Sequence, residues 1–233
     1  MTTAPHTRVG GGSARVVGAT ALALAASLIV QNVVVGAGGA PDYGDPIADV
    51  LAFHAEHRGA IAIAVGLEAL NLPLLLGFLA GLHGLVASRT TAGATWSRLA
   101  LAAGATLSAI WAIYAVAWIG AVLSVGDGGE PSVAFELSWR LHAAGLGMAL
   151  PALGTTFLGA AMAAHAAALT PAWQRLLGMV GAVLLVAAGT ASLAIADGSS
   201  MVFVGVAGLA LWILWLVATG LRLVRGRSVD IDA

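Results

Sequence analysis

The sequence predicts an all-α fold: a polytopic membrane helical bundle with six transmembrane helices and both termini in the cytoplasm. Hydrophobic residues make up 60% of the chain and charged residues only 9%, whereas soluble proteins carry about 25% charged residues. The apolar residues fall into six runs, each about as long as a helix that crosses a bilayer. In the topology that these runs imply, most of the arginines also lie on one side of the membrane.

We expect one transmembrane domain over residues 15–222. Residues 1–14 are polar and Gly-rich, which predicts a disordered cytoplasmic N-terminus, and residues 223–233 are expected to form a cytoplasmic tail. The expected spans cover residues 16–35, 60–85, 99–125, 143–168, 176–194 and 201–221.

The first span has two interpretations. It is long for the apolar region of a signal peptide, which favours a retained helix. The small residues Gly38, Gly39 and Ala40 offer a cleavage site, so a cleaved signal peptide is the alternative.

The charges orient the six spans. The side that holds both termini receives eight of the ten arginines, and the other side receives only Arg58 and Arg140. The positive-inside rule therefore places the termini in the cytoplasm. We expect a multi-pass protein of the cytoplasmic (inner) cell membrane, from a bacterium.

The stretch from Asp45 to Arg89 contains the most polar span. We expect one long helix, with Asp45 as its N-cap and Pro46 at its first position. At 100° per residue, several polar side chains fall within about 60° of Glu68 and form one stripe. These are His54, His57, Asn71 and His83.

Glu68 lies about 15 Å deeper than Arg58 along such a helix. A carboxyl group at that depth is expected to face the bundle interior, either protonated or paired. It would then form a polar pathway or binding site. Alternatively, it makes a structural hydrogen bond with Thr106, Ser108 or Tyr114.

The fourth span has a face of small residues around Gly145 and Ala149, which suits close helix packing. Contact of this face with the second span would bring Arg140 and His142 to the outer end of the polar stripe. Arg140 also has Glu136 one turn before it as an ion-pair partner. The candidates for a ligand or proton site are therefore Glu68, Asn71, His57, Arg58, Arg140 and His142.

His54, His57 and His142 are weak candidates for metal binding, because all three lie on the outer side. Their spacing matches no established zinc signature, and a histidine-rich interfacial segment explains them as well. We expect no metal and no cofactor.

Several motifs resemble those of a group of actinobacterial six-span membrane proteins of unknown function. They are Phe53-His54-Ala-Glu-His57-Arg58, Leu79-Ala80-Gly81-Leu82 and Leu169-Thr-Pro171-Ala-Trp173. The resemblance covers about residues 16–221 and implies the same architecture. It implies no activity and assigns no functional residue.

The absence of cysteine and lysine excludes thiol and Schiff-base chemistry, and no recognisable catalytic motif occurs. Our first hypothesis is a non-enzymatic accessory, interaction or small-molecule-binding protein with a polar intramembrane site near Glu68. The second is a small proton-coupled transporter that uses Glu68. The third is a membrane-embedded lipid- or quinone-acting enzyme that uses the outer histidines. Expected partners are the lipid bilayer and a second copy or another membrane protein, but not nucleic acid, since the net charge is −1.

Overall fold

The computed structural model describes residues 11–125 and 130–226. This part of the chain forms eight helices and no strand: α1 (Gly11–Ala37), α2 (Ile47–Glu56), α3 (Arg58–Ala87), α4 (Thr91–Leu123), α5 (Val133–Ala166), α6 (Ala172–Thr190), α7 (Ser192–Ala196) and α8 (Met201–Arg225). Six of them, all but α2 and α7, are long and apolar enough to cross a membrane. The all-α membrane bundle with six spans is therefore confirmed.

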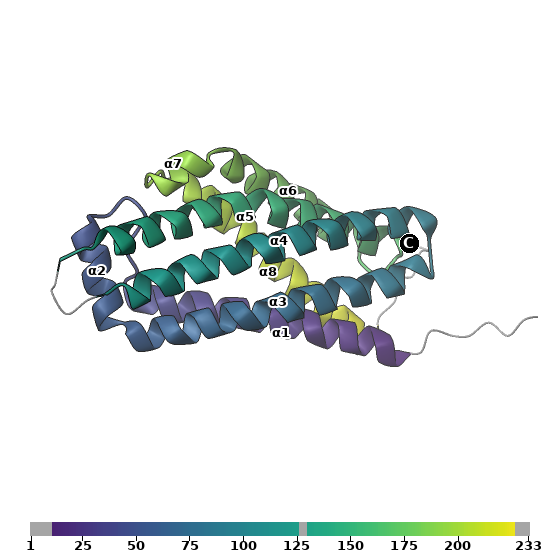
Figure 1. Cartoon of the computed structure of the whole chain (residues 1–233). Helices are drawn as coiled ribbons and strands as arrows, with labels where there is room; N and C mark the ends of the chain where they lie inside the picture. The colour runs from purple at the N-terminus through teal and green to yellow at the C-terminus, as the bar shows by residue number, and fades with distance from the viewer. Residues whose placement is uncertain (1–10, 126–129, 227–233) are drawn as a thin grey trace, which may run out of the picture.

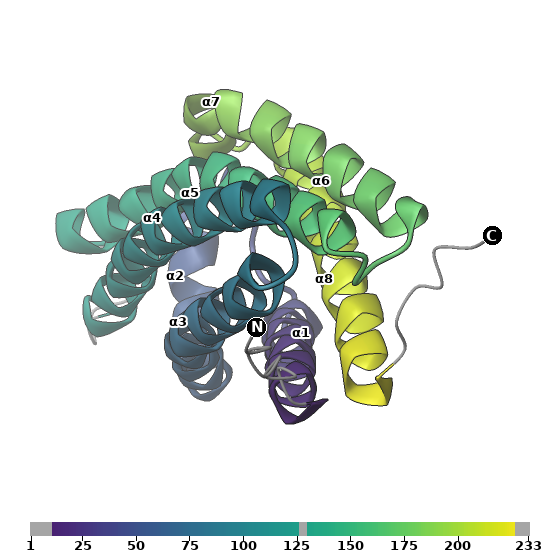
Figure 2. The same cartoon turned by 90° about the vertical axis from the view of Figure 1, so that its right-hand side faces the viewer.

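The six long helices form a closed ring in the order α1, α3, α4, α5, α6, α8, in which each helix packs on the next and α8 returns to α1 (Figure 2). The start of α1 and the end of α8 lie at one end of the bundle, here called the terminal end (Figure 1). The short helices α2 and α7 lie at the opposite end, here called the α2 end.

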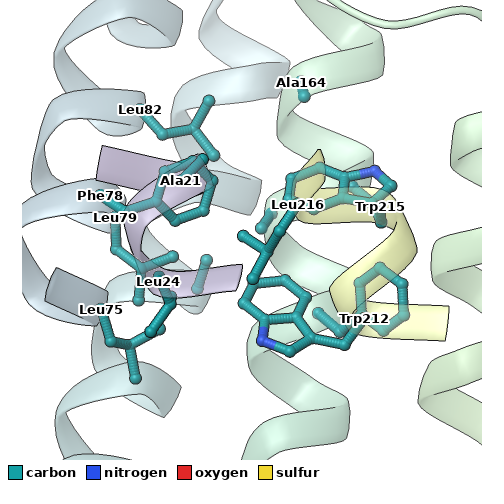
Figure 3. Packing of buried hydrophobic residues seen from close by; sticks show 14 of the residues in the cluster. Ala21, Leu24, Leu75, Phe78, Leu79, Leu82, Ala164, Trp212, Trp215 and Leu216 are labelled. Atoms are coloured by element: carbon teal, nitrogen blue, oxygen red, sulfur yellow. The ribbon is translucent and has the colours of Figure 1, made fainter. Parts of the chain in front are cut away.

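An aromatic core fills the half of the ring that lies toward the terminal end. Phe78 of α3 packs edge-on against Trp212 and Trp215 of α8, and the two indoles stack with centroids 5.5 Å apart (Figure 3). These three side chains are at most 1% exposed. Because these rings are buried, large side chains fill this half of the bundle. Offset and edge-to-face ring pairs contribute about 0.5–1.5 kcal/mol beyond the area that they bury.

The stretch from Asp45 to Arg89 is two helices and not the single helix that the sequence predicted. The chain breaks at His57, which has φ −108° and ψ 22° and separates α2 from α3. Asp45 does not cap α2 through its side chain, because Pro46 precedes the helix and the Asp45 carboxylate accepts a hydrogen bond from the Asp42 backbone N–H. The break moves His54 off the face that carries Glu68.

Other helix ends also differ from the expected spans. α1 begins at Gly11, so residues 11–14 are helical, while residues 1–10 and 227–233 lie outside the described part of the chain. α4 begins at Thr91, well before residue 99, and α6 ends at Thr190, after which α7 forms a separate turn. Ser132 caps α5 by accepting a hydrogen bond from the backbone N–H of Phe135.

The small-residue face of α5 packs mainly on α4, and not on α3 as we expected. A Cβ atom added at Gly145 would lie 3.1 Å from Tyr114, and one at Gly159 would lie 2.8 Å from the Ala100 backbone nitrogen. Glycine is needed at both positions because the two helix backbones approach so closely. The ring order explains the difference, since α4 lies between α3 and α5.

Candidate functional site

A buried polar triad joins α1 to α3. The Gln31 side chain of α1 donates a hydrogen bond from Nε2 to Glu68 Oε1, and Asn71 donates from Nδ2 to Gln31 Oε1, both at 2.9 Å. Glu68 is 1% exposed and Asn71 is fully buried. Glu68 and Asn71 lie three residues apart, so both project from one face of α3 toward α1.

Each end of the triad keeps hydrogen-bonding capacity. Glu68 Oε2 and Asn71 Oδ1 are buried and make no hydrogen bond of standard geometry within the described chain, although the Trp111 indole of α4 interacts with the Glu68 carboxyl group. Buried polar atoms normally have a partner. The triad can therefore accept a further donor.

A cavity of about 120 Å³ adjoins Glu68, here called the inner chamber. Its walls are mostly apolar side chains of α1, α4, α5 and α8, and its polar lining comes from Gln31, Asn32, Glu68, Trp111 and Tyr114. A concave apolar site with a few converging polar groups is the usual form of a small-molecule site.

A larger cavity of about 460 Å³, here called the vestibule, lies toward the α2 end. Tyr114, Leu146 and Val202 line both the vestibule and the inner chamber, so the two cavities adjoin. Two loops meet beside the vestibule: a Cβ at Gly198, which has φ +87°, would lie 2.3 Å from the Gly44 Cα. Only glycine suits that conformation and that contact.

Hydrogen bonds on both ring nitrogens hold His54, which lines the vestibule, as a neutral imidazole. Its Nδ1–H donates to the Val50 carbonyl at 2.7 Å, and its Nε2 accepts from the Trp118 indole N–H at 3.0 Å. A proton on Nε2 would remove that acceptor. Burial lowers the pKa of His54, while the bond to Val50 acts in the opposite direction.

Aromatic rings surround the second vestibule histidine. His142 stacks on Tyr114 with ring centroids 3.8 Å apart and on Trp139 at 5.3 Å, and its Nδ1 bonds the Tyr114 carbonyl at 3.1 Å. Trp139 is 8% exposed and its indole N–H has no partner in the described structure. It therefore lies inside the bundle.

The structure brings together only part of the predicted site. Glu68 and Asn71 lie in the triad, and His142 lies in the adjoining vestibule. His57 stacks instead on Phe53 at 4.6 Å. The other candidates lie outside both cavities: Arg58 borders a groove between α3 and α4, and Arg140 pairs on the surface with Glu136 at 2.8 Å.

One structural expectation for the polar groups was wrong. Thr106, Ser108 and Tyr114 are not hydrogen-bond partners of Glu68; Thr106 and Ser108 bond carbonyls of their own helix. The histidine His83, predicted on the same stripe, bonds Ser97 near the terminal end. Within the described residues, no group of three or more histidine or carboxylate side chains is placed to hold a metal ion.

Sequence reasoning missed Gln31 as the central residue of the triad. Its signal was available: Gln31 is a polar residue within the first apolar run, and such residues hydrogen-bond across helices. It also missed the vestibule, because Tyr43, Trp118 and Trp139 come from segments whose contact depends on the break at His57.

Comparisons with family models, with curated proteins and with solved structures found no match. The resemblance to actinobacterial six-span proteins therefore stays a prediction.

Proposed function

We propose that this integral membrane protein is a non-enzymatic binding protein that holds a small molecule in the inner chamber and the vestibule. The observation that carries the proposal is the buried Glu68 carboxyl group, whose Oε2 makes no hydrogen bond of standard geometry and which lies beside a mostly apolar chamber that adjoins a larger cavity. A buried carboxyl oxygen without a partner is costly, and a ligand donor would remove that cost.

We further propose that the protein lies in the cytoplasmic membrane of a bacterium, with the α2 end outside. The arginine distribution supports this orientation. The ligand would then enter from the outside through the vestibule.

Mass spectrometry of molecules that co-purify with the protein tests the binding proposal. Leu146 lines both cavities, so Leu146→Trp should fill their junction and sharply reduce the retained molecule. Glu68→Gln should reduce it as well, because an amide nitrogen in place of one carboxyl oxygen can only donate, whereas a carboxyl oxygen can accept a hydrogen bond from the ligand. Val183→Trp is the matched control, since Val183 is 67% exposed on α6 and lines neither cavity.

A molecule that wild type and Val183→Trp retain and that Leu146→Trp loses would support the proposal. All four proteins must first show similar thermal unfolding, so that loss of ligand is not loss of fold. Equal retention by Leu146→Trp and wild type, or nothing retained by any variant, would contradict it.

Proton-coupled transport through Glu68 is the second candidate, favoured by the same buried carboxyl group, since acidic side chains within membranes commonly mark transport paths. The packed core around Phe78, Trp212 and Trp215 blocks the route toward the terminal end in this conformation. Substrate-dependent proton uptake into proteoliposomes, abolished by Glu68→Gln, would favour transport over binding alone.

A further inference from the structure

The charges along the two cavities have one sign. Asp42 lies at the exposed side of the vestibule and Glu68 at the inner chamber, whereas neither cavity is lined by an arginine. Arg58 and Arg140, the two arginines of the α2 end, border other grooves. An exposed carboxylate at the vestibule and no arginine in the lining of either cavity favour a cationic occupant over an anionic one.

The vestibule wall is unusually aromatic. Six rings from loops and helices that are distant in sequence line it: Tyr43, Phe53, Tyr114, Trp118, Trp139 and Phe203. Aromatic faces carry negative electrostatic potential and attract organic cations, most strongly where water is excluded. Enclosures of this kind recognise quaternary ammonium groups.

The two vestibule histidines do not oppose a cation. His54 is held neutral by its bonds to Val50 and Trp118. His142 presents its ring among Tyr114 and Trp139, and a free imidazole with a pKa of about 6.5 is neutral at pH 8. The buried indole N–H of Trp139 adds a donor for an oxygen on the same ligand.

We propose that the vestibule binds an organic cation, with a quaternary or tertiary ammonium group among the aromatic rings and its apolar part toward the inner chamber. This ligand class rests on the proposed binding function and makes it specific. The cation would enter past Asp42, and its remaining donor groups would face Glu68.

Three water-soluble probes of nearly the same shape separate charge from size: choline, the neutral 3,3-dimethylbutan-1-ol and the anionic 3,3-dimethylbutanoate. Binding to the full chain in nanodiscs is measured at pH 8 by titration calorimetry. We expect choline to bind about tenfold more tightly than the neutral alcohol, in line with a partly desolvated cation–π contact. The anion should bind more weakly than both.

Two variants locate the effect. Asp42→Asn should weaken choline binding a few-fold and leave the alcohol unchanged, because exposed charges act weakly. Asp49→Asn is its control, since Asp49 is an exposed acid of α2 that lines neither cavity. Tyr43→Leu removes one ring from a loop and should weaken choline more than the alcohol.

The outcomes separate the two proposals. If the alcohol binds as tightly as choline, or if the retained molecule is neutral and lost in Leu146→Trp, the cation proposal is overturned and the binding function stands. If no probe binds saturably and no molecule is retained, both fail. If Asp42→Asn and Tyr43→Leu both keep the choline selectivity of wild type, the vestibule is overturned as its site.

Discussion

At the scale of single residues, Gln31 determines what Glu68 can do. It donates to the carboxyl group and accepts from Asn71, so one amide fixes the orientation of two polar side chains of α3. Oε1 of Glu68 is thereby engaged, whereas Oε2 makes no hydrogen bond of standard geometry. The triad is structural through Oε1 and can be functional through Oε2.

Gln31→Leu should lower the free energy of unfolding by about 1–2 kcal/mol, because it leaves Glu68 Oε1 and Asn71 Nδ2 buried without partners. The double variant Gln31→Leu with Glu68→Leu should recover part of this loss, since no buried carboxyl group remains. Thermal unfolding in detergent measures both. The neighbouring Asn32→Leu, which changes an exposed amide bonded to its own helix, should cost less; an equal cost would contradict a role specific to Gln31.

His54 should make stability depend on pH. Its pKa is lowered in the fold, so below about 6.5, the value for a free imidazole, the unfolded chain binds more protons than the native protein. The free energy of unfolding should therefore fall as the pH drops from 6.5 toward the native pKa, by up to about 1.4 kcal/mol per pH unit for one proton. At higher pH this contribution is fully present.

Thermal midpoints between pH 4 and 8 check this dependence in wild type and His54→Gln. The variant keeps an acceptor for Trp118 but cannot titrate in this range, so its profile should be flatter. His57→Gln is the control, because it removes a neighbouring histidine that contacts Phe53 and not Trp118. A profile for His54→Gln that parallels wild type would refute the interpretation.

At the scale of helices, the sequence predicted which segments form the long apolar helices better than it predicted where those helices end and which of them pack together. Apolar runs determine which segments cross the bilayer, so all six were found. The break at His57 has no strong signal, because neither proline nor glycine occupies that position. The pairing of α5 with α4 was also missed, since small residues show that a face packs closely but not on which helix.

The crossing of α1 and α8 gives an element-scale test. A Cβ atom at Gly220 would lie 2.9 Å from the Gly18 carbonyl oxygen and 2.8 Å from Leu22 Cγ, so Gly220→Ala should force the two helices apart and lower the thermal midpoint. Gly66→Ala on α3 is the matched control, because nothing lies within 4 Å of its added Cβ and alanine is the better helix former. Equal midpoints for both variants would argue against a tight crossing.

At the scale of the whole molecule, the ring divides into two halves with different roles. Around Phe78 and Trp212 the interior is filled by large side chains, whereas toward the α2 end the inner chamber and vestibule remain open. α1 belongs to both halves: Leu24 lies in the core and Gln31 in the triad. Composition predicted a membrane helical bundle, but the open half depends on loops and on α2, whose placement the sequence does not specify.

Entry of the ligand from outside requires that the open half faces outward, and the absence of cysteine makes this orientation testable. Single cysteines at the exposed residues Asp42 and Asp197 mark the α2 end, and those at Thr91 and Ala172 mark the terminal end. Because the arginines concentrate at the terminal end, a membrane-impermeant maleimide should label the first pair in intact cells and the second only after permeabilisation. The reverse pattern would turn the vestibule toward the cytoplasm and require a ligand from inside the cell.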